Sequence, residues 1–185
     1  MKIKAIPMLI VLSGALFLLC GSRTAAPAFS TLEVVKDVDL NRYLGLWYEI
    51  ARLPMYFEKN LVAVTAEYSL RKDGKIMVKN SGDVKVIGGR RKVAIGRAWV
   101  PDPSESAKLK VSFFGPFSAD YWIIELDTEE YSYAVVGEPD RKYFWILSRT
   151  PVMDEMLYSE IVARAAEKGF DVSRLYCTPQ SGKDE

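Results

Sequence analysis

Few side chains in this sequence are suited to acid–base or nucleophilic chemistry. The chain contains no histidine, and its two cysteines are Cys20 and Cys177. The absence of histidine removes the most common general acid or base, the serine–histidine and cysteine–histidine nucleophile pairs, and the most frequent ligand for zinc or haem. We therefore expect a protein that is not an enzyme, with no catalytic residue, no metal site and no cofactor.

Two strand carboxylates are the remaining candidates for acid–base work. Glu67 falls on the polar side of its alternating segment, whereas Glu125 shares parity with Tyr121 and Ile123 and is expected to point toward the same interior. A buried carboxylate there would serve either as an acid or base or as the polar contact that orients a ligand. We take the ligand contact as the prediction and keep the catalytic role as the alternative.

The N-terminal residues have the pattern of an export signal. Lys2 and Lys4 precede an apolar run over residues 5–20. A membrane-spanning helix needs about 20 apolar residues, so this shorter run fits the apolar region of a signal peptide better than a permanent anchor. We predict a signal peptide over residues 1–28 and a location outside the cytoplasm, in the periplasm or at the outer membrane.

Two routes for removing the signal stay open. Cleavage after Ala28 would release the mature chain. In the alternative, a lipoprotein signal over residues 1–19 is removed, and Cys20 becomes the lipidated first residue that associates with a membrane. Leu18 and Leu19 stand where bacterial lipoproteins usually have a small residue before the cysteine. On either route Cys177 is expected to be unpaired or linked to another chain, so that packing supplies the stability.

Residues 29–185 are predicted to form one domain, because they suffice for one core and are too few for two comfortable ones. Without the three basic residues of the N-terminal segment, acidic residues slightly outnumber basic ones. The basic run over residues 90–92 is interpreted as a solvated face. We therefore expect no nucleic-acid partner.

From residue 43 onward, short runs alternate between apolar and polar residues. In residues 61–70, for example, Val64, Ala66 and Tyr68 fall on one side. This period of two is typical of a strand with one buried face. Strands are expected over residues 43–53, 61–70, 75–80, 91–100, 108–114, 121–126, 131–136 and 143–148. Eight short strands at this spacing predict an antiparallel sandwich or barrel.

One helix is expected after the last of these strands. Thr150 and Pro151 form a start signal, and Gly169 fits the left-handed position at a helix end. One face carries apolar residues at helical spacing, namely Met153, Leu157, Ile161 and Ala165. This helix should pack on the outside of the sheet, with a last short strand over residues 173–177.

The opening strand contains a string that resembles a family motif. Gly45-Leu46-Trp47 is similar to the Gly-x-Trp motif at the start of the lipocalin family, and Arg149 stands where that family has a basic residue just before its helix. The similarity to bacterial members is carried by residues 47–52, 111–117 and 145–151. The resemblance covers residues 35–177. It implies an all-β, eight-stranded antiparallel up-and-down lipocalin β-barrel with one C-terminal α-helix packed outside.

The resemblance also implies roles for the motif residues. In the family, the tryptophan closes the narrow end of the barrel and the basic residue lies across its ring. We therefore expect Arg149 to lie over Trp47, a contact worth about 0.5 to 2 kcal/mol, and Gly45 to permit close approach of the chain. All three are predicted to be structural. The family's middle motif, Thr-Asp-Tyr, is present only in altered form around Asp127 and Tyr131.

An eight-stranded barrel is just wide enough to hold one small ligand. The resemblance implies that the protein binds, transports or stores a small hydrophobic ligand, a fatty acid or a lysophospholipid. Contacts with that ligand are expected from the inward-facing residues Val64, Tyr68, Val111, Phe113, Tyr121, Ile123, Glu125 and Trp145. Plain packing of the barrel interior is the alternative for each of them.

The loop over residues 53–60 is expected to form a partial lid at the open end. Its residues Met55, Tyr56 and Phe57 would suit lipid entry or a membrane surface, unless the loop packs on itself. Two other functions stay open: an envelope stress or structural protein with an incidental cavity, acting as a monomer or a homodimer, and a lipocalin-fold enzyme.

Overall fold

The computed structural model describes residues 31–182 of the chain. The expected signal peptide over residues 1–28, its cleavage after Ala28 and the lipidation of Cys20 lie outside the described residues.

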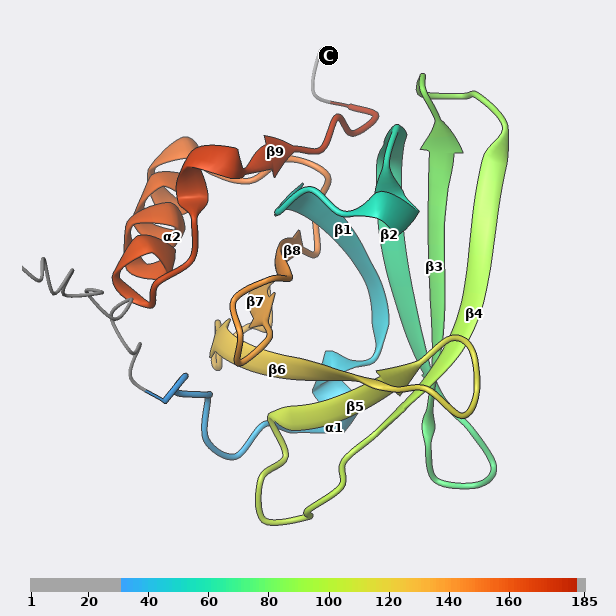
Figure 1. Ribbon diagram of the computed structural model, residues 1–185, viewed down its shortest axis with the longest axis vertical. Coiled ribbons are helices and arrows are strands. Elements are labelled where there is room, and N and C mark those ends of the chain that lie inside the picture. Colours follow the sequence, from blue (N-terminus) through green and yellow to red (C-terminus); the bar gives the residue numbers. More distant parts are fainter. Residues whose placement is uncertain (1–30, 183–185) are drawn as a thin grey trace, which may run out of the picture.

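Eight antiparallel strands form a closed barrel (Figure 1). Each strand pairs with the next along the chain, and β1 pairs with both β2 and β8, which closes the sheet. The strands are β1 (Gly45–Arg52), β2 (Leu61–Leu70), β3 (Ile76–Val84), β4 (Arg91–Trp99), β5 (Lys108–Ser112), β6 (Ala119–Leu126), β7 (Tyr133–Gly137) and β8 (Phe144–Ser148). The predicted eight-stranded up-and-down barrel is confirmed.

The C-terminal segment completes the barrel wall at one end. Strand β9 (Tyr176–Cys177) pairs with the last residues of β1, where β1 has separated from β2. Beyond β9, the side-chain amide of Gln180 donates hydrogen bonds to the carbonyl oxygens of Glu49 and Val64, each at 2.8 Å. Because these carbonyls belong to β1 and β2, the C-terminal segment bridges the two strands where they diverge.

Helix α2 (Glu155–Glu167) lies against the outer wall of the barrel, as predicted (Figure 1). The predicted start at Thr150 and Pro151 was wrong. Asp154 caps the helix instead, because its carboxylate accepts a hydrogen bond from the backbone N–H of Leu157 at 2.9 Å. Gly169 has a φ of 88° just after the last turn, which confirms the predicted stop.

The remaining helical segments are short. They are α1 (Leu40–Tyr43), which precedes β1, and the 3₁₀ turns η1 (Tyr56–Glu58) and η2 (Val172–Arg174). Within residues 31–182, no helix has the length and apolar character needed to cross a membrane.

Apolar side chains form two cores, one inside the barrel and one between the barrel and α2. The inner core includes Trp47, Tyr68 and Ile123. The outer core includes Phe144 of β8, Ile161 of α2 and Phe170. Burying each such side chain is worth about 1.5 to 3 kcal/mol, so the helix is held on the barrel chiefly by its apolar face.

Strand β6 changes the face that it presents at a β-bulge. Ile123 pairs with Val136, but Glu125 pairs with Val135, so one extra residue of β6 lies between them. Ile123 belongs to the inner core, whereas Ile124 belongs to the core against α2. The prediction that Glu125 points inward was therefore wrong, because the bulge reverses the alternation.

Candidate functional site

The closed end of the barrel is built around Trp47 and Arg149. The guanidinium carbon of Arg149 lies 3.8 Å from the centre of the Trp47 ring. Trp47 is fully buried, and its indole N–H donates a hydrogen bond to the carbonyl oxygen of Tyr43 at 2.8 Å. Gly45 has a φ of 97°, and a Cβ there would stand 3.3 Å from the Arg149 side chain. The structure thus places all three motif residues in the arrangement that the family resemblance implied.

Arg149 also ties together the backbone around the closed end. Its side chain donates hydrogen bonds to the carbonyl oxygens of Leu46 at 2.8 Å, Arg42 at 2.8 Å, Leu44 at 2.9 Å and Tyr131 at 3.2 Å. Partial burial lowers the pKa of Arg149 from its ordinary value. These contacts use four of the five N–H donors of the guanidinium, so the group has a structural role at this end.

The altered middle motif contributes to the same end. The backbone N–H of Asp39 donates a hydrogen bond to the Tyr131 hydroxyl at 2.9 Å, and the Arg42 guanidinium lies 4.2 Å from the centre of the Tyr131 ring. The carboxylate of Asp127 accepts a hydrogen bond from the Ser132 hydroxyl at 2.5 Å. Although this motif departs from the family pattern, its Tyr131 still fastens the N-terminal segment to the barrel.

Three tyrosines form a hydrogen-bonded cluster inside the barrel. The Tyr121 hydroxyl lies 2.8 Å from the hydroxyl of Tyr43 and 2.7 Å from that of Tyr68. The Tyr43 ring packs 5.0 Å from the Trp47 ring, centre to centre, so the cluster lies next to the closed end. Burial raises the pKa of all three phenols above the ordinary value, which keeps them protonated.

The barrel wall nearer the open end carries apolar side chains that are not fully covered. Val111, Phe113 and Trp145 pack against the inner core but remain partly exposed. Ala94 lies on the inner face of β4 by its pairing with Asn80, and it is exposed. Gly96 leaves room for Phe113, because a Cβ at Gly96 would stand 2.8 Å from the ring. The interior is therefore a cup that its own side chains do not fill.

A buried cluster of charged groups lies where the open end meets the C-terminal segment. Arg52 donates to the carboxylate of Glu49 and, at 2.9 Å, to the Thr178 hydroxyl. Its guanidinium also lies 3.6 Å from the Glu58 carboxylate. Burial raises the pKa of Glu58 to about 8, and the nearby Glu49 carboxylate adds to this effect while Arg52 opposes it.

Glu58 connects this charged cluster to the wall of the cup. The indole N–H of Trp145 donates a hydrogen bond to the Glu58 carboxylate at 3.3 Å. The Trp145 ring stacks on Tyr143, 6.0 Å from centre to centre, and Tyr143 packs beside Phe57 of the lid loop. The lid loop is thus fastened to the wall by the Trp145–Glu58 hydrogen bond, by the hydrogen bond from the backbone N–H of Leu53 to the carbonyl oxygen of Phe144, and by a row of aromatic rings.

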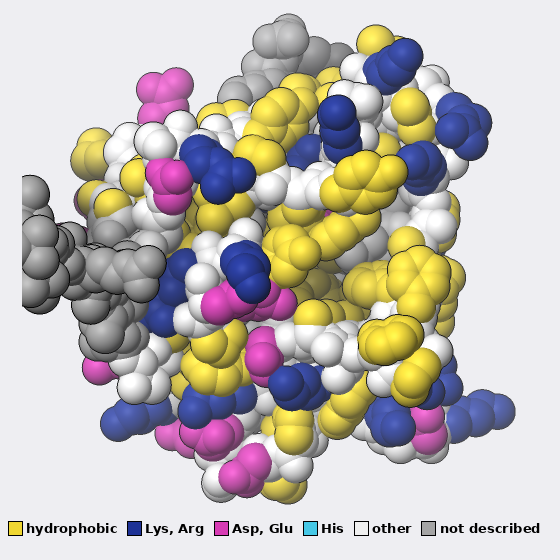
Figure 2. Space-filling model, viewed as in Figure 1, with side chains coloured by type: hydrophobic (Ala, Val, Ile, Leu, Met, Phe, Trp, Pro, Cys, Tyr) yellow, Lys and Arg dark blue, Asp and Glu magenta, His cyan; other side chains and the backbone are white. Residues whose placement is uncertain are grey.

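Three loops at the open end expose apolar side chains, which we call the rim. Tyr56 is 93% exposed, Phe114 81% and Phe117 78%. The whole rim consists of Tyr56, Phe57, Val86, Ile87, Phe114 and Phe117. Figure 2 shows hydrophobic side chains around a hollow in this face and lysine and arginine side chains over the tip of β3 and β4. The exposure of Tyr56 and Phe57 argues against a lid loop that packs only on itself.

The structure brings most of the predicted ligand contacts together. Tyr68 and Ile123 belong to the inner core, and Val111, Phe113, Tyr121 and Trp145 pack against it. Val64 is buried beside Gly82 of β3. Glu125 is excluded from this group, because on the outside of the barrel its carboxylate accepts a hydrogen bond from Arg164 of α2 at 2.6 Å.

Sequence reasoning missed other residues of the interior. Tyr43 was assigned to the first strand but lies in α1, and Glu58 lies in a 3₁₀ turn where no alternation applies. Asn80 lies in the predicted strand over residues 75–80, two positions after the buried Val78. Because side chains two positions apart share a face of a strand, this spacing could have predicted that Asn80 points inward. Its side-chain oxygen Oδ1 is buried without a hydrogen-bond partner among the described residues.

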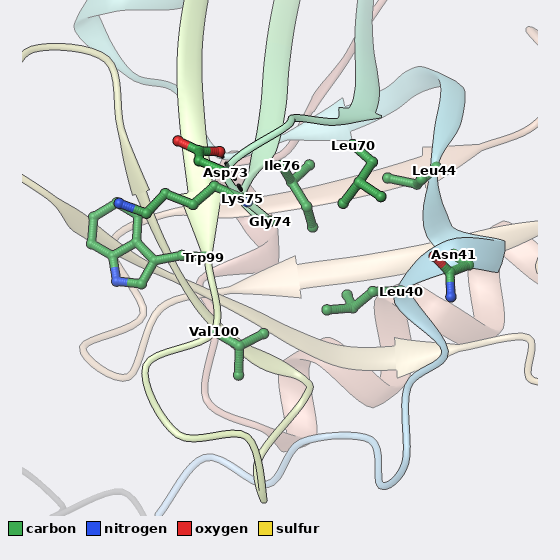
Figure 3. Close-up of a pocket in the computed structure, with 10 residues that line it drawn as sticks. All are labelled: Leu40, Asn41, Leu44, Leu70, Asp73, Gly74, Lys75, Ile76, Trp99 and Val100. Atoms are coloured by element: carbon green, nitrogen blue, oxygen red, sulfur yellow. Dashed lines mark hydrogen bonds between the residues drawn. The ribbon is translucent and has the colours of Figure 1, made fainter.

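A separate cavity of about 500 Å³ lies at the closed end, outside the cup (Figure 3). Leu40 of α1, Leu44 just after it, and Leu70 and Ile76 from the β2–β3 hairpin point toward it. Its polar border includes Lys75, whose ammonium lies 5.7 Å from the centre of the Trp99 ring. Residues 31–182 contain no cluster of histidine, cysteine and carboxylate side chains able to hold a metal ion.

Comparison with known proteins identifies similar chains. A family model described as a lipocalin-like domain matches residues 38–180. The outer membrane lipoprotein Blc of Vibrio cholerae is 45% identical over 150 residues, covering 81% of this chain and 87% of that protein. The protein of the same name from Escherichia coli K12 is 42% identical over 179 residues, covering 97% and 99%.

More distant relatives agree with these matches. Bovine apolipoprotein D is 30% identical over 153 residues, covering 80% of this chain and 79% of that protein. Among solved structures, insecticyanin from the tobacco hornworm superimposes with a TM-score of 0.65 at 24% identity, covering 83% of this chain and 87% of that one. The structural likeness agrees with the closed barrel and its outer helix.

Proposed function

Because the chain belongs to the lipocalin family, we propose that it holds one small hydrophobic ligand, a fatty acid or a lysophospholipid, inside its barrel. In this proposal it carries or stores that ligand in the bacterial envelope. The similar proteins named outer membrane lipoprotein support the location. The cup formed by the inner faces of β2–β6 and β8 is the proposed binding site.

One observation carries the proposal: the inner face of a closed barrel keeps apolar side chains in contact with solvent. Val111, Phe113 and Trp145 are only partly buried, although they lie inside the molecule. Apolar area left in contact with water costs about 25 cal/mol per Å². A ligand that covers this area gains that free energy, whereas a barrel serving only as a scaffold would be more stable with its interior filled.

The partners and the protonation of the carboxylates that could act as acid or base support binding rather than catalysis. Glu49 and Glu58 are both buried, and both contact Arg52. Glu125 is paired with Arg164 outside the barrel. Glu49 and Glu125 are each paired with an arginine, and burial raises the pKa of Glu58 to about 8, so that this carboxyl already carries its proton at neutral pH and does not serve as a general base there.

The rim supports loading of the ligand from a membrane. Its aromatic side chains stand on two loops of the open end, Val86 and Ile87 stand on the third, and Lys85, Arg90 and Lys92 lie beside this third loop. Aromatic side chains flanked by lysine and arginine suit the boundary between acyl chains and anionic head groups. We infer that the open end faces the lipid surface, so that a ligand passes from the membrane into the cup without crossing water.

The direct test is to identify lipids that copurify with the protein. Mass spectrometry of an organic extract of protein purified from its native envelope should reveal monoacyl lipids at close to one per chain. Titration of the delipidated protein with a fatty acid and with a lysophospholipid should then change the fluorescence of Trp145. No copurifying lipid and no fluorescence change would favour a structural or stress function, and turnover of an added lipid would favour an enzyme.

A pair of tryptophan substitutions locates the site. Ala94→Trp places a large side chain on the inner face of β4, whereas Ile95→Trp places the same side chain on its outer face, where Ile95 is already exposed. We expect Ala94→Trp to abolish binding and Ile95→Trp to leave it unchanged. Equal affinities in the two variants would exclude the cup as the site.

A further inference from the structure

Strand β4 has one edge that is unpaired over much of its length. On one side, residues 91–98 of β4 pair with residues 76–83 of β3 without a register shift. On the other side, β5 pairs with β4 only over residues 97–99. The β5–β6 hairpin turns away beyond this point, and in Figure 1 the rest of β4 rises above the hairpin loop. Residues 91–96 therefore form a free sheet edge near the open end of the barrel.

The backbone groups on this free edge belong to Arg91, Val93 and Ile95. The backbone N–H of Val84 donates a hydrogen bond to the carbonyl oxygen of Arg90 at 3.1 Å, so Arg90 faces β3. Because successive residues of an antiparallel strand face its two neighbours alternately, Arg91, Val93 and Ile95 direct their N–H and C=O groups away from β3. Among the described residues, these groups make no backbone hydrogen bond on that side. Such a row is a template for one more strand.

Side chains on both faces of the free edge are exposed. Val93 and Ile95 are each 55% exposed on the outer face. Lys92 and Ala94 are exposed on the inner face. A sheet edge is commonly protected by a bulge, a proline, a covering segment or charge. Within the described part of the chain, residues 91–96 have only the last of these, so the edge is accessible to a partner.

The charge around the free edge is uniformly positive. Residues 84–101 and the β5–β6 loop over residues 113–118 contain no acidic residue. The basic residues in the first of these segments are Lys85, Arg90, Arg91, Lys92 and Arg97. Only Arg91 among them forms an ion pair within the described residues, with Asp83 at 2.8 Å. Like charges on adjacent strands are destabilising, so this edge disfavours a second copy of itself and favours an acidic partner.

We propose that the free edge of β4 binds an extended acidic segment of another protein, which joins the sheet as a strand beside residues 91–96. Hydrogen bonds to the backbone of Arg91, Val93 and Ile95 supply affinity. Alternate side chains of the segment meet different surfaces, because those on the outer face pack against Val93 and Ile95 while those on the inner face lie beside Lys92. The partner segment is therefore one in which apolar and acidic residues alternate over about six positions.

A membrane surface matches fewer features of this edge than a strand does. Anionic head groups attract the lysine and arginine side chains beside the rim, but they form no regular ladder with the backbone of Val93 and Ile95. An added strand satisfies the backbone groups and the positive charge together. This inference is independent of the ligand proposed for the cup.

Peptide binding to the delipidated, unmodified protein tests the proposal. The probe is a fluorescein-labelled peptide of about seven residues in which valine and glutamate alternate, a length that spans the free edge. Fluorescence anisotropy should show that it binds at least about tenfold more tightly than a peptide of alternating valine and lysine. A glutamate peptide with two successive central prolines should also bind at least about tenfold more weakly, because proline cannot donate to the ladder. Equal affinity for the three peptides, or no binding of the probe, would overturn the inference and leave the proposed function intact.

Amide hydrogen exchange then locates the contact without any substitution. The N–H groups of Val93 and Ile95 should exchange at least about tenfold more slowly with the glutamate peptide bound, whereas those of Lys92 and Ala94, which face β3, should change little. If phosphatidylglycerol vesicles alone protect Val93 and Ile95, the edge faces a membrane. If a higher protein concentration alone protects them, the edge pairs with a second copy. Either result would overturn the inference.

Two substitutions separate the backbone contribution from the charge contribution. Val93→Pro removes an N–H that points away from β3, so it should weaken binding of the glutamate peptide at least about tenfold while the barrel stays folded by circular dichroism. Lys92→Glu should reduce the preference for the glutamate peptide over the lysine peptide at least about threefold. Lys36→Glu is the matched control, because Lys36 is an exposed lysine of the N-terminal segment. Equal preferences in Lys92→Glu and Lys36→Glu would overturn the inference.

Discussion

The guanidinium of Arg149 stacks on Trp47 at 3.8 Å from the ring centre while it donates hydrogen bonds to four backbone carbonyls of the closed end. The Arg149 side chain therefore covers the Trp47 ring and also supplies hydrogen-bond donors to the backbone carbonyl oxygens of the chain that turns around it. Stacking alone is worth about 0.5 to 2 kcal/mol, and hydrogen bonds from a charged donor about 1.5 to 3 kcal/mol each.

Removal of this side chain should destabilise the barrel. We expect Arg149→Met to lower the free energy of unfolding by about 2 to 4 kcal/mol, because the carbonyls of Leu44 and Leu46 lose their donor. Trp47→Ala should cost about 3 to 5 kcal/mol through the cavity that it leaves. Denaturant unfolding monitored by circular dichroism measures both changes.

A second arginine–tryptophan pair provides the control for this prediction. Arg97 lies 6.0 Å from the centre of the Trp99 ring, on the surface of β4. Arg97→Met should change the free energy of unfolding by less than about 0.5 kcal/mol. Equal losses for Arg149→Met and Arg97→Met would show that Arg149 does not close the barrel.

The buried Glu58 predicts a stability that falls as the pH rises. Its pKa of about 8 in the folded protein lies above the ordinary value of 4.5, chiefly because of burial and then because of the Glu49 carboxylate, with Arg52 opposing both. The folded state therefore binds a proton that the unfolded state has released. The stabilisation is fully present below about pH 4.5 and is lost by about pH 8, with a slope of at most about 1.4 kcal/mol per pH unit.

Glu58→Gln isolates this effect. The variant should show a flatter dependence of the free energy of unfolding on pH between 5 and 8 than the unmodified protein. Glu138, whose burial raises its pKa to about 7, contributes a slope of the same sign and is unchanged in both proteins. Parallel curves for the two proteins would refute the role assigned to Glu58.

The placement of Glu125 outside the barrel leads to a third prediction. Its carboxylate accepts hydrogen bonds from Arg164 at 2.6 Å and from the Tyr133 hydroxyl at 3.1 Å. Glu125→Gln should loosen helix α2 and cost about 0.5 to 1 kcal/mol of stability, because the pair is partly solvated. The affinity for a fatty acid should stay unchanged, whereas Trp145→Ala should weaken it several-fold. If Glu125→Gln lost as much affinity as Trp145→Ala, Glu125 would have to contact the ligand, and its placement outside the barrel would be wrong.

Alternation of apolar and polar residues predicts the strands of this barrel where no bulge interrupts them. Strand β2 forms over the predicted residues 61–70, because its apolar face is buried in the barrel and its polar face is solvated. The same rule failed at Glu125, where a single bulge residue shifts the pattern. Bulges depend on how β6 must curve around the barrel and against α2, and a period-two count carries no information about that curvature.

The polar groups of the interior were harder to predict for a different reason. The contact of Arg149 with Trp47 followed from motif residues, but the Tyr43–Tyr121–Tyr68 cluster joins α1, β6 and β2 across the barrel. The proximity of these hydroxyls depends on how far each strand is staggered when the barrel closes. Likewise, Glu58 meets Arg52 and Trp145 only because the lid loop folds back over the open end.

The rim predicts that the protein binds membranes without a lipid anchor. Its three most exposed aromatic side chains, Tyr56, Phe114 and Phe117, stand on two loops of the open end, with lysine and arginine beside the third loop. In a Cys20→Ser background, which removes any lipid at that position, the protein should sediment with anionic phospholipid vesicles. Binding should weaken with added salt, because part of the attraction is electrostatic.

Serine substitutions test whether the rim forms this contact. Tyr56→Ser, Phe114→Ser and Phe117→Ser combined should lower vesicle binding at least about tenfold, because each aromatic ring that enters the bilayer boundary contributes about 1 kcal/mol or more. Val93→Ser with Ile95→Ser is the matched control, because both residues are exposed and apolar but lie on the outer wall of β4. If the control pair reduces binding as much as the rim variant does, the contact is a nonspecific response to apolar surface and the open end is not the membrane-facing side.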